Sequence, residues 1–383
     1  MNKRRRLAQR ACYNVCDEQT LIKENLMQTN LRLYHRVLEQ LCQWLPGERI
    51  TRQRNMALLV MGLYLGRAVH MSLVVRNWPS PSKEPSLVNR LRRFLNNPRV
   101  DVRRWYHPIA VQLLQTFVGQ RIRLVIDCTK VGLNFRLLSI SLCYRRRTLP
   151  LVWSVHRGSR GHITVEQQLA LFRTVSHLIP RQSEVWVMGD TGFQTVPLVQ
   201  WLCGQGWHFV LRQQGRITVR QAGQPWRKLN DFDLAPGQTR IIGWVRLTRK
   251  YDAGWFWLIL HWEKGQDEPW YLLADRNGRH DLIRLYRRHM WTEEMYGDMK
   301  GHGFDLEATH LDDEQRISRL VLAVCIAFVW LTALGSWVVK KGLRHFVDHK
   351  SRRDKSYFRI GWDWLARCLR LDDPFHCCFR PYP

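Results

Sequence analysis

Three acidic side chains, far apart in the chain, have the residue type and position to hold divalent cations. Asp127 directly follows the apolar run Leu124–Ile126, Asp190 follows the apolar run 185–188 after one glycine, and Glu293 lies in a later polar stretch. A carboxylate at a buried strand needs a partner, so each aspartate should lie at a strand end or face a cation. Oxygen ligands suit Mg²⁺ or Mn²⁺ rather than zinc. Two such ions would serve in-line displacement at phosphorus. The alternative is that both aspartates end strands for turn geometry alone.

The stretch from Tyr286 to Lys300 carries the third acid. It is rich in helix-favouring residues, and we expect a single helix over it. Tyr286, Glu293 and Lys300 are seven residues apart, so they return to one line of that helix, with His289 beside them. This face would place Glu293 on a cation, with Lys300 and Tyr286 on phosphate oxygens. The alternative is a solvated face with Glu–Lys pairs.

The segments between these acids predict an α/β core. From Arg121 onward, three short β-rich runs separated by turn residues predict three antiparallel strands. A helix from about Thr164 to before Pro180, the strand that ends at Asp190, a second helix and a further strand should follow. The predicted order is therefore β-β-β-α-β-α-β. A β-rich insertion of residues 215–275 separates this core from the last acid.

The apolar run Leu320–Val339 is long enough to span a membrane. It follows a charged, amphipathic lead-in, and a helix that is apolar on all sides is also expected at the centre of a large domain. We therefore expect a buried core helix and no membrane partner.

Composition indicates a polyanionic partner. The chain has 383 residues and a formal net charge of +28, with its basic excess densest in the predicted helices of residues 1–120. Arg92, Arg93, Arg103 and Arg104 lie there beside aromatic residues, a combination typical of DNA phosphate contact. The basic start, residues 1–16, is either a phosphate-binding arm or a tail. The ten cysteines form no metal tetrad and predict reduced thiols in a cytoplasmic, nucleoid-associated protein.

Together these motifs resemble those of the DDE transposases of bacterial insertion sequences. Asp127-Cys128-Thr129 resembles the first motif of the family, Asp-x-Thr, and the four residues from Asp190 to Phe193 resemble the second, Asp-x-Gly-aromatic. The last motif of one large group is Tyr-x2-Arg-x3-Glu-x6-Lys, and the chain has Tyr286, Glu293 and Lys300 at its spacing. His289 departs from the pattern, because Arg is usual there. Arg keeps its charge and grips phosphate bidentately, whereas His titrates near neutral pH.

The resemblance implies an RNase H-like mixed-sheet core interrupted by the β-rich insertion, with a basic helical N-terminal region and a helical C-terminus. It implies cleavage at transposon-end inverted repeats and transfer of 3′-hydroxyl ends to target DNA, by a homodimer on paired ends of double-stranded DNA. The metal ligands would be Asp127, Asp190 and Glu293, holding two Mg²⁺ or Mn²⁺ ions. The DNA or phosphate contacts would be Tyr286, His289, Lys300, Arg212 and Trp270, with Trp270 stacked on a flipped base.

Two other functions stay open from the sequence. An RNase H-like nuclease or resolvase would cut without joining, and an inactive DNA-binding relative would explain His289. The predicted regions are a basic DNA-binding region (1–118), the core (119–213), the β-rich insertion (214–276), the core completion with the catalytic helix (277–340) and a basic C-terminal tail (341–383).

Overall fold

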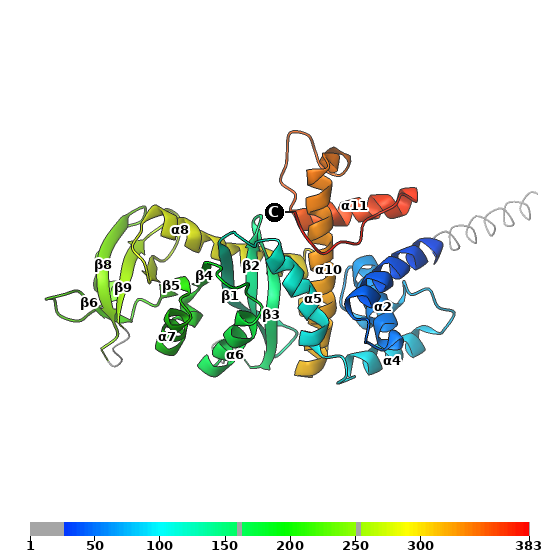
Figure 1. The fold of residues 1–383 in the computed structure, drawn as a ribbon, viewed down its shortest axis with the longest axis horizontal. Helices are drawn as coiled ribbons and strands as arrows, with labels where there is room; N and C mark the ends of the chain where they lie inside the picture. Colours follow the sequence, from blue (N-terminus) through cyan, green and yellow to red (C-terminus); the bar gives the residue numbers. More distant parts are fainter. Residues whose placement is uncertain (1–26, 159–162, 250–253, 383) are drawn as a thin grey trace, which may run out of the picture.

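The computed structural model describes residues 27–158, 163–249 and 254–382. The basic start of the chain, for which we predicted an arm or a tail, lies outside these residues. The molecule is elongated, with the N-terminal helices at one end and the β-rich insertion at the other (Figure 1). The N-terminal region is helical as predicted, with residues 27–44 followed by α2 (Ile50–Gly66), α3 (Met71–Val75), α4 (Glu84–Leu95) and α5 (Val102–Gln115).

The central sheet has the order predicted from the sequence. Strands β1 (Ile122–Val131), β2 (Phe135–Tyr144) and β3 (Arg147–Arg157) form an antiparallel meander. Strands β4 (Val185–Gly189) and β5 (His208–Gln213) then add parallel to β1, in the spatial order β3-β2-β1-β4-β5. Helices α6 (Val165–Ser176) and α7 (Val196–Gly204) connect these last strands. This α/β arrangement is an RNase H-like core, as expected.

The first crossover helix shows how local sequence sets the element bounds. Helix α6 begins after Thr164, whose hydroxyl accepts a hydrogen bond from the Gln167 amide, while the Gln167 side chain bonds back to the Thr164 amide. This reciprocal capping box satisfies two amides at the helix start. Leu171, Phe172 and Val175 then recur at three- and four-residue spacing and are buried.

The β-rich insertion extends the core sheet. It contains β6 (Thr218–Arg220), β7 (Arg227–Lys228), β8 (Thr239–Leu247), β9 (Trp255–His261) and β10 (Trp270–Ala274), with the 3₁₀ turn η2 (Leu229–Asp231). Strand β10 pairs antiparallel with both β5 and β9, so core and insertion form one ten-stranded sheet. The sequence predicted four β-rich segments in the insertion, which correspond to β6, β8, β9 and β10, but it predicted neither β7 nor this continuity.

The predicted single helix over 286–300 is wrong. The structure has α8 (His280–Tyr286), a 3₁₀ turn η3 (Arg287–His289) and α9 (Met290–Met299). A 3₁₀ turn has three residues per turn, so side chains three apart eclipse one another. Tyr286 and His289 consequently stack, with ring centroids 5.8 Å apart and planes 8° from parallel.

The long apolar segment is a buried core helix, as predicted. Helix α10 (Glu314–Lys340) begins at Asp313, whose side chain caps the Arg316 amide. Among the described residues it is long and apolar enough to cross a membrane, yet 94% of its most hydrophobic window is buried inside the protein. It stands between the sheet and the N-terminal helices (Figure 1).

The C-terminal residues fold against α10, which corrects the expectation of a basic tail. Helix α11 (Tyr357–Leu371) crosses α10 at two glycines, and a Cβ on Gly335 would collide with the Tyr357 carbonyl oxygen. A Cβ on Gly361 would likewise collide with the Leu331 carbonyl oxygen. Beyond α11, Phe375 and Phe379 are buried. Helix α11 confirms the predicted helical C-terminus, and the region that we predicted as a basic tail contributes buried residues to the core from Phe358 onward.

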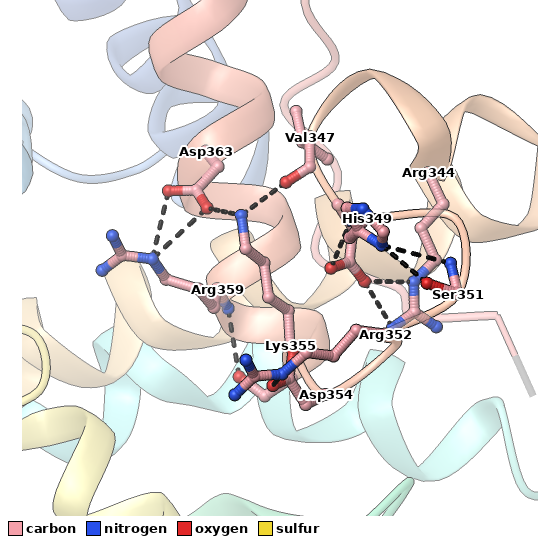
Figure 2. Close-up of polar contacts among 11 residues, drawn as sticks. Arg344, Val347, His349, Ser351, Arg352, Asp354, Lys355, Arg359 and Asp363 are labelled. Atoms are coloured by element: carbon pink, nitrogen blue, oxygen red, sulfur yellow. Dashed lines mark hydrogen bonds and ion pairs between the residues drawn. The ribbon is translucent and has the colours of Figure 1, made fainter.

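Ion pairs hold the loop between α10 and α11, which contains the 3₁₀ turn η5 (Leu343–Phe346). Lys355 lies between the Val347 carbonyl and the Asp363 carboxylate, 2.8 Å from the latter, and Arg359 also contacts Asp363 (Figure 2). Since Lys355 lies in the loop and Asp363 on α11, the Lys355–Asp363 ion pair fixes the loop to that helix, whereas the Arg359–Asp363 pair lies within α11. The loop therefore presents its other basic side chains from a defined position.

Candidate active site

The register of the central strands places Asp127 and Asp190 side by side. Ile126 and Gly189 are the last partners in the β1–β4 ladder, and each aspartate directly follows one of them. Asp127 is not at a strand end as we predicted, because β1 continues beside β2, where Asp127 pairs with Ser139. It lies instead where the pairing with β4 stops.

Strand alternation directs Asp127 toward the face covered by α8. Its side chain lies on the same face as that of Val125, two residues earlier, and Val125 belongs to the apolar cluster that includes α8. Met188, two residues before Asp190, belongs to the same cluster. The α8–η3–α9 segment therefore covers the two acids.

Within that segment, His289 lies close to both aspartates. One ligand atom from each of Asp127, Asp190 and His289 lies within 4.8 Å of the other two. His289 is only 5% exposed, and its Nε2 is buried without a hydrogen-bond partner among the described residues. Burial also lowers the pKa of His289, which favours the neutral imidazole. The site thus contains two acids and one neutral nitrogen base.

Glu293 lies farther out in the same pocket. The pocket has a volume of about 980 Å³, and its walls include Asp190, His289 and Glu293. The Glu293 side chain is exposed on α9. Burial, followed by repulsion from Asp190 and Glu294, raises the pKa of Glu293. Glu293 is therefore close enough to interact with the two aspartates but lies outside the group formed by Asp127, Asp190 and His289.

The two aspartates and Glu293 concentrate negative charge. Burial, the largest cause, and the charge of Asp190 raise the pKa of Asp127 to about 8, although the Cys128 amide, 2.7 Å from its carboxylate, opposes the shift. Glu293 raises this pKa further, and Lys300 lowers it. A divalent cation would neutralise this charge with oxygen ligands of the kind that Mg²⁺ and Mn²⁺ prefer. The residues present therefore fit such an ion.

Lys300 is tied to β1 beside the acids. Its ammonium donates to the Thr129 hydroxyl and to Glu307, both at 2.7 Å. Glu307 lies on the 3₁₀ turn η4 (Leu306–Ala308). Thr129 is two residues after Asp127 on the same strand, so Lys300 lies on the face of the sheet that carries the acid. The last residue of the Tyr-x2-Arg-x3-Glu-x6-Lys pattern is thus brought to the site.

Two contributions to the site were missed from the sequence. The Tyr296 hydroxyl lies 2.8 Å from the Ser139 hydroxyl and donates to the Asp127 carbonyl at 3.1 Å, which ties α9 to β1 and β2. The Arg147 guanidinium on β3 donates to the buried Asp298 carboxylate of α9 at 2.7 Å. The only sequence signal for Tyr296 is its position three residues, one helical turn, after Glu293.

The aromatic residues at the mouth are packed against one another. Trp270 is 8% exposed and contacts Tyr286 edge to face, with centroids 5.0 Å apart. Arg212 forms an ion pair with Glu268 at 2.9 Å and lines the same pocket. In this state Trp270 is packed as a core residue, and its stacking on a DNA base stays a prediction.

The predicted DNA-contacting arginines of the N-terminal region lie elsewhere. Arg92 and Arg93 on α4, and Arg103 and Arg104 on α5, are exposed. Arg92 and Arg93 line a separate hollow of about 460 Å³ together with Arg316. Among the described residues that line the acid pocket, none of these four is included.

A second concave surface adjoins the acid pocket, and we call it the basic groove. Its volume is about 630 Å³, and it shares Arg287 and Met290 with the acid pocket. It lies between the β2–β3 turn, α9 and the loop of Figure 2. Its cationic residues are Arg145, Arg146, Arg147, Arg287, Arg344, Arg353 and Lys355. The groove therefore continues the acid pocket along a strongly positive surface.

The strand order and the convergent acids define an RNase H-like protein with a candidate divalent-cation site. Residues 127–330, more than half of the chain, match the sequence profile of the family described as "Transposase DDE domain". The chain belongs to this family. The matched segment begins at Asp127 and includes Asp190 and Glu293.

Comparison with other proteins adds little to this assignment. A solved structure of a piggyBac transposase synaptic complex with hairpin DNA is similar, with a TM-score of 0.45 and 11% identity, covering 90% of this chain and 80% of that chain. No curated protein sequence matches the chain significantly.

Proposed function

We propose that the protein is the transposase of a bacterial insertion sequence of the Tyr-Arg-Glu-Lys group. It would cut at the terminal inverted repeats and transfer 3′-hydroxyl ends to target DNA, with Asp127, Asp190 and Glu293 as ligands of two Mg²⁺ or Mn²⁺ ions. The observation that carries this proposal is the β1–β4 register, which brings two aspartates together beneath the helical segment that bears Glu293. Membership of the transposase family supports the reaction class.

The roles of the residues follow from where they lie. When bound, the cations supply activation of the attacking oxygen and stabilisation of the leaving oxygen. Asp127 and Asp190 provide buried and half-buried carboxylates, while Glu293 reaches the site from the exposed side. Lys300, held by Thr129, would present its ammonium to a phosphate oxygen. Tyr286 and His289 would fix the wall of the pocket through their stacking.

The DNA path that we propose runs from the acid pocket into the basic groove. The two concavities share Arg287 and Met290, so one strand could cross both without leaving the protein surface. Trp291, half-buried in the groove, offers an aromatic face to a base. A net charge of +28 supports a polyanion as the partner. The exposed arginines of α4 and α5 and Arg212 would contact further phosphates.

The remaining proposals concern organisation. Residues 1–118 would bind DNA, residues 119–213 and 277–340 would form the catalytic core, and residues 214–276 would be the insertion that carries Trp270. We also propose a homodimer that holds two transposon ends, working in the bacterial cytoplasm on the nucleoid. Native mass spectrometry of the complex with DNA ends would test the dimer: two protein copies per pair of ends are expected, and one copy would contradict it.

The test uses a plasmid that carries the gene with its flanking DNA. In Mg²⁺ or Mn²⁺ the wild-type protein should nick or cut the plasmid at the borders of the element, and Asp190→Asn should bind the same DNA without cutting. His345→Gln, an exposed histidine outside the pocket, is the matched control and should cut normally. Unchanged cutting by Asp190→Asn would reject the site.

A second reaction separates the transposase from a nuclease that only cuts. Pre-nicked ends with free 3′-hydroxyl groups are incubated with the protein, a target plasmid and Mg²⁺. Joined products are expected from a transposase. Cutting of intact ends without any joining would favour the nuclease.

A further inference from the structure

We propose that His289 is a nitrogen ligand of a divalent cation held by Asp127 and Asp190, and that this ligand biases the site toward Mn²⁺ over Mg²⁺. The inference rests on the proposed metal site and adds to it. It assigns His289 a different role from the phosphate contact that the family pattern suggests for this position.

The spacing of the three side chains is close to that of a coordination shell. Their ligand atoms lie within 4.8 Å of one another. Ligand atoms at about 2.1 Å from an ion in an octahedral shell are about 3 to 4 Å apart. A small change in the side-chain rotamers would therefore bring the three ligand atoms to coordination distance, without movement of the strands.

The imidazole is buried and held in place. At 5% exposure its Nε2 has no hydrogen-bond partner among the described residues, and buried polar atoms without partners are rare in folded proteins. Tyr286 stacks on the ring at 5.8 Å, and the 3₁₀ turn η3 sets the direction of both side chains. A preorganised imidazole that has an unpartnered nitrogen and lies beside two carboxylates is suited to a cation.

The presence of His289, where the family pattern has Arg, changes what this position can bind. Arg is always charged and carries donors only, so it cannot ligate a metal, whereas neutral His can. The exchange of Arg for His289 thus replaces a fixed positive charge with a metal ligand. Glu293 is exposed and lies outside the group formed by the two aspartates and His289, so it can complete the site from the solvent side.

The expected consequence is a change in metal preference. Mg²⁺ binds oxygen ligands and takes nitrogen reluctantly, whereas imidazole suits transition metals. The ratio of Mn²⁺ to Mg²⁺ affinity should therefore fall when the imidazole is removed, by about tenfold, the lower end of the range seen when partners of metal sites are lost.

The test detects a nitrogen ligand of the bound ion directly. Electron spin-echo envelope modulation of Mn²⁺ bound to the full chain should show ¹⁴N coupling from a directly bound nitrogen. His289→Phe keeps a flat ring for stacking on Tyr286 but removes the nitrogen, and it should lose the coupling. His310→Phe, at an exposed histidine, is the matched control and should retain it. His289→Arg, which restores the family residue, should also lose it. Competition titrations of the same proteins with Mn²⁺ and Mg²⁺ should show the fall in affinity ratio.

The outcomes test the nitrogen ligand and the carboxylate metal site separately. Bound Mn²⁺ without ¹⁴N coupling in the wild-type protein would overturn the inference while leaving the carboxylate site intact, and this holds even if His289→Phe fails to fold. An unchanged affinity ratio in both His289 variants would overturn it too. If Mn²⁺ binding were absent, or unaffected by Asp190→Asn, the proposed metal site itself would fail.

Discussion

Removing the buried charge of Asp127 should stabilise the metal-free protein at alkaline pH. Burial and Asp190 raise the pKa of Asp127 from 3.8 to about 8 in the folded state. Because this pKa is raised, the folded state binds the proton more tightly than the unfolded state does. The stability that the proton contributes is complete below pH 3.8 and is lost as the pH rises to about 8. Asp127→Asn has no charge to bury and lacks this loss.

The shift sets the size of the effect. Each unit of pKa shift corresponds to about 1.4 kcal/mol of differential stability. Between pH 5 and pH 8, three units, the free energy of unfolding of the wild-type protein should fall by about 4 kcal/mol relative to that of Asp127→Asn. Proton uptake by neighbouring acids reduces this figure, so it is a ceiling.

The assay is urea denaturation in EDTA at pH 5 and pH 8, followed by the same series in Mn²⁺. The matched control is Asp233→Asn, because Asp233 is an exposed aspartate of the β-rich insertion. That variant removes a solvated charge and should leave the free energy of unfolding nearly unchanged at both pH values. Added Mn²⁺ should stabilise the wild-type protein more than Asp127→Asn. A constant difference between wild type and Asp127→Asn across pH, or an equal response to Mn²⁺, would refute the reasoning.

Three further predictions concern packing, DNA binding and the site lysine. Gly335→Ala should destabilise the protein by about 1 to 3 kcal/mol, because its Cβ would force α11 away from α10, whereas Gly204→Ala, with open space at its Cβ, should be near neutral in thermal denaturation. The double variant Arg146→Ser with Arg353→Ser should weaken DNA binding and lower the salt slope of log K by about two in fluorescence anisotropy, and an unchanged slope would exclude phosphate contacts in the basic groove. Lys300→Gln should reduce DNA cleavage while leaving Mn²⁺ binding in place, and wild-type cleavage rates would remove Lys300 from the reaction.

Local sequence was enough to predict the core. Alternating and apolar runs with turn residues between them were enough to predict the sequence of strands and helices, because each of these strands is largely buried. The parallel register then brings Asp127 and Asp190 together without further information. The capping box at Thr164 likewise places the start of α6 from sequence alone.

Features that depend on distant contacts were not predictable in this way. The pairing of β10 with β5 joins segments more than 50 residues apart, and no local pattern encodes it. The 3₁₀ turn before α9 occurs in a sequence that favours helix throughout, since tertiary packing overrides a weak local preference. Helices α10 and α11 can cross closely because Gly335 and Gly361 have no side chains. The local sequence does not show that these two glycines face each other.

The most direct test of the central claim is anomalous diffraction from crystals soaked in Mn²⁺. The account predicts an anomalous peak in contact with carboxylate oxygens of both Asp127 and Asp190, on the side of the sheet covered by α9. Mn²⁺ bound at other positions while these two carboxylates stay free of metal would contradict it.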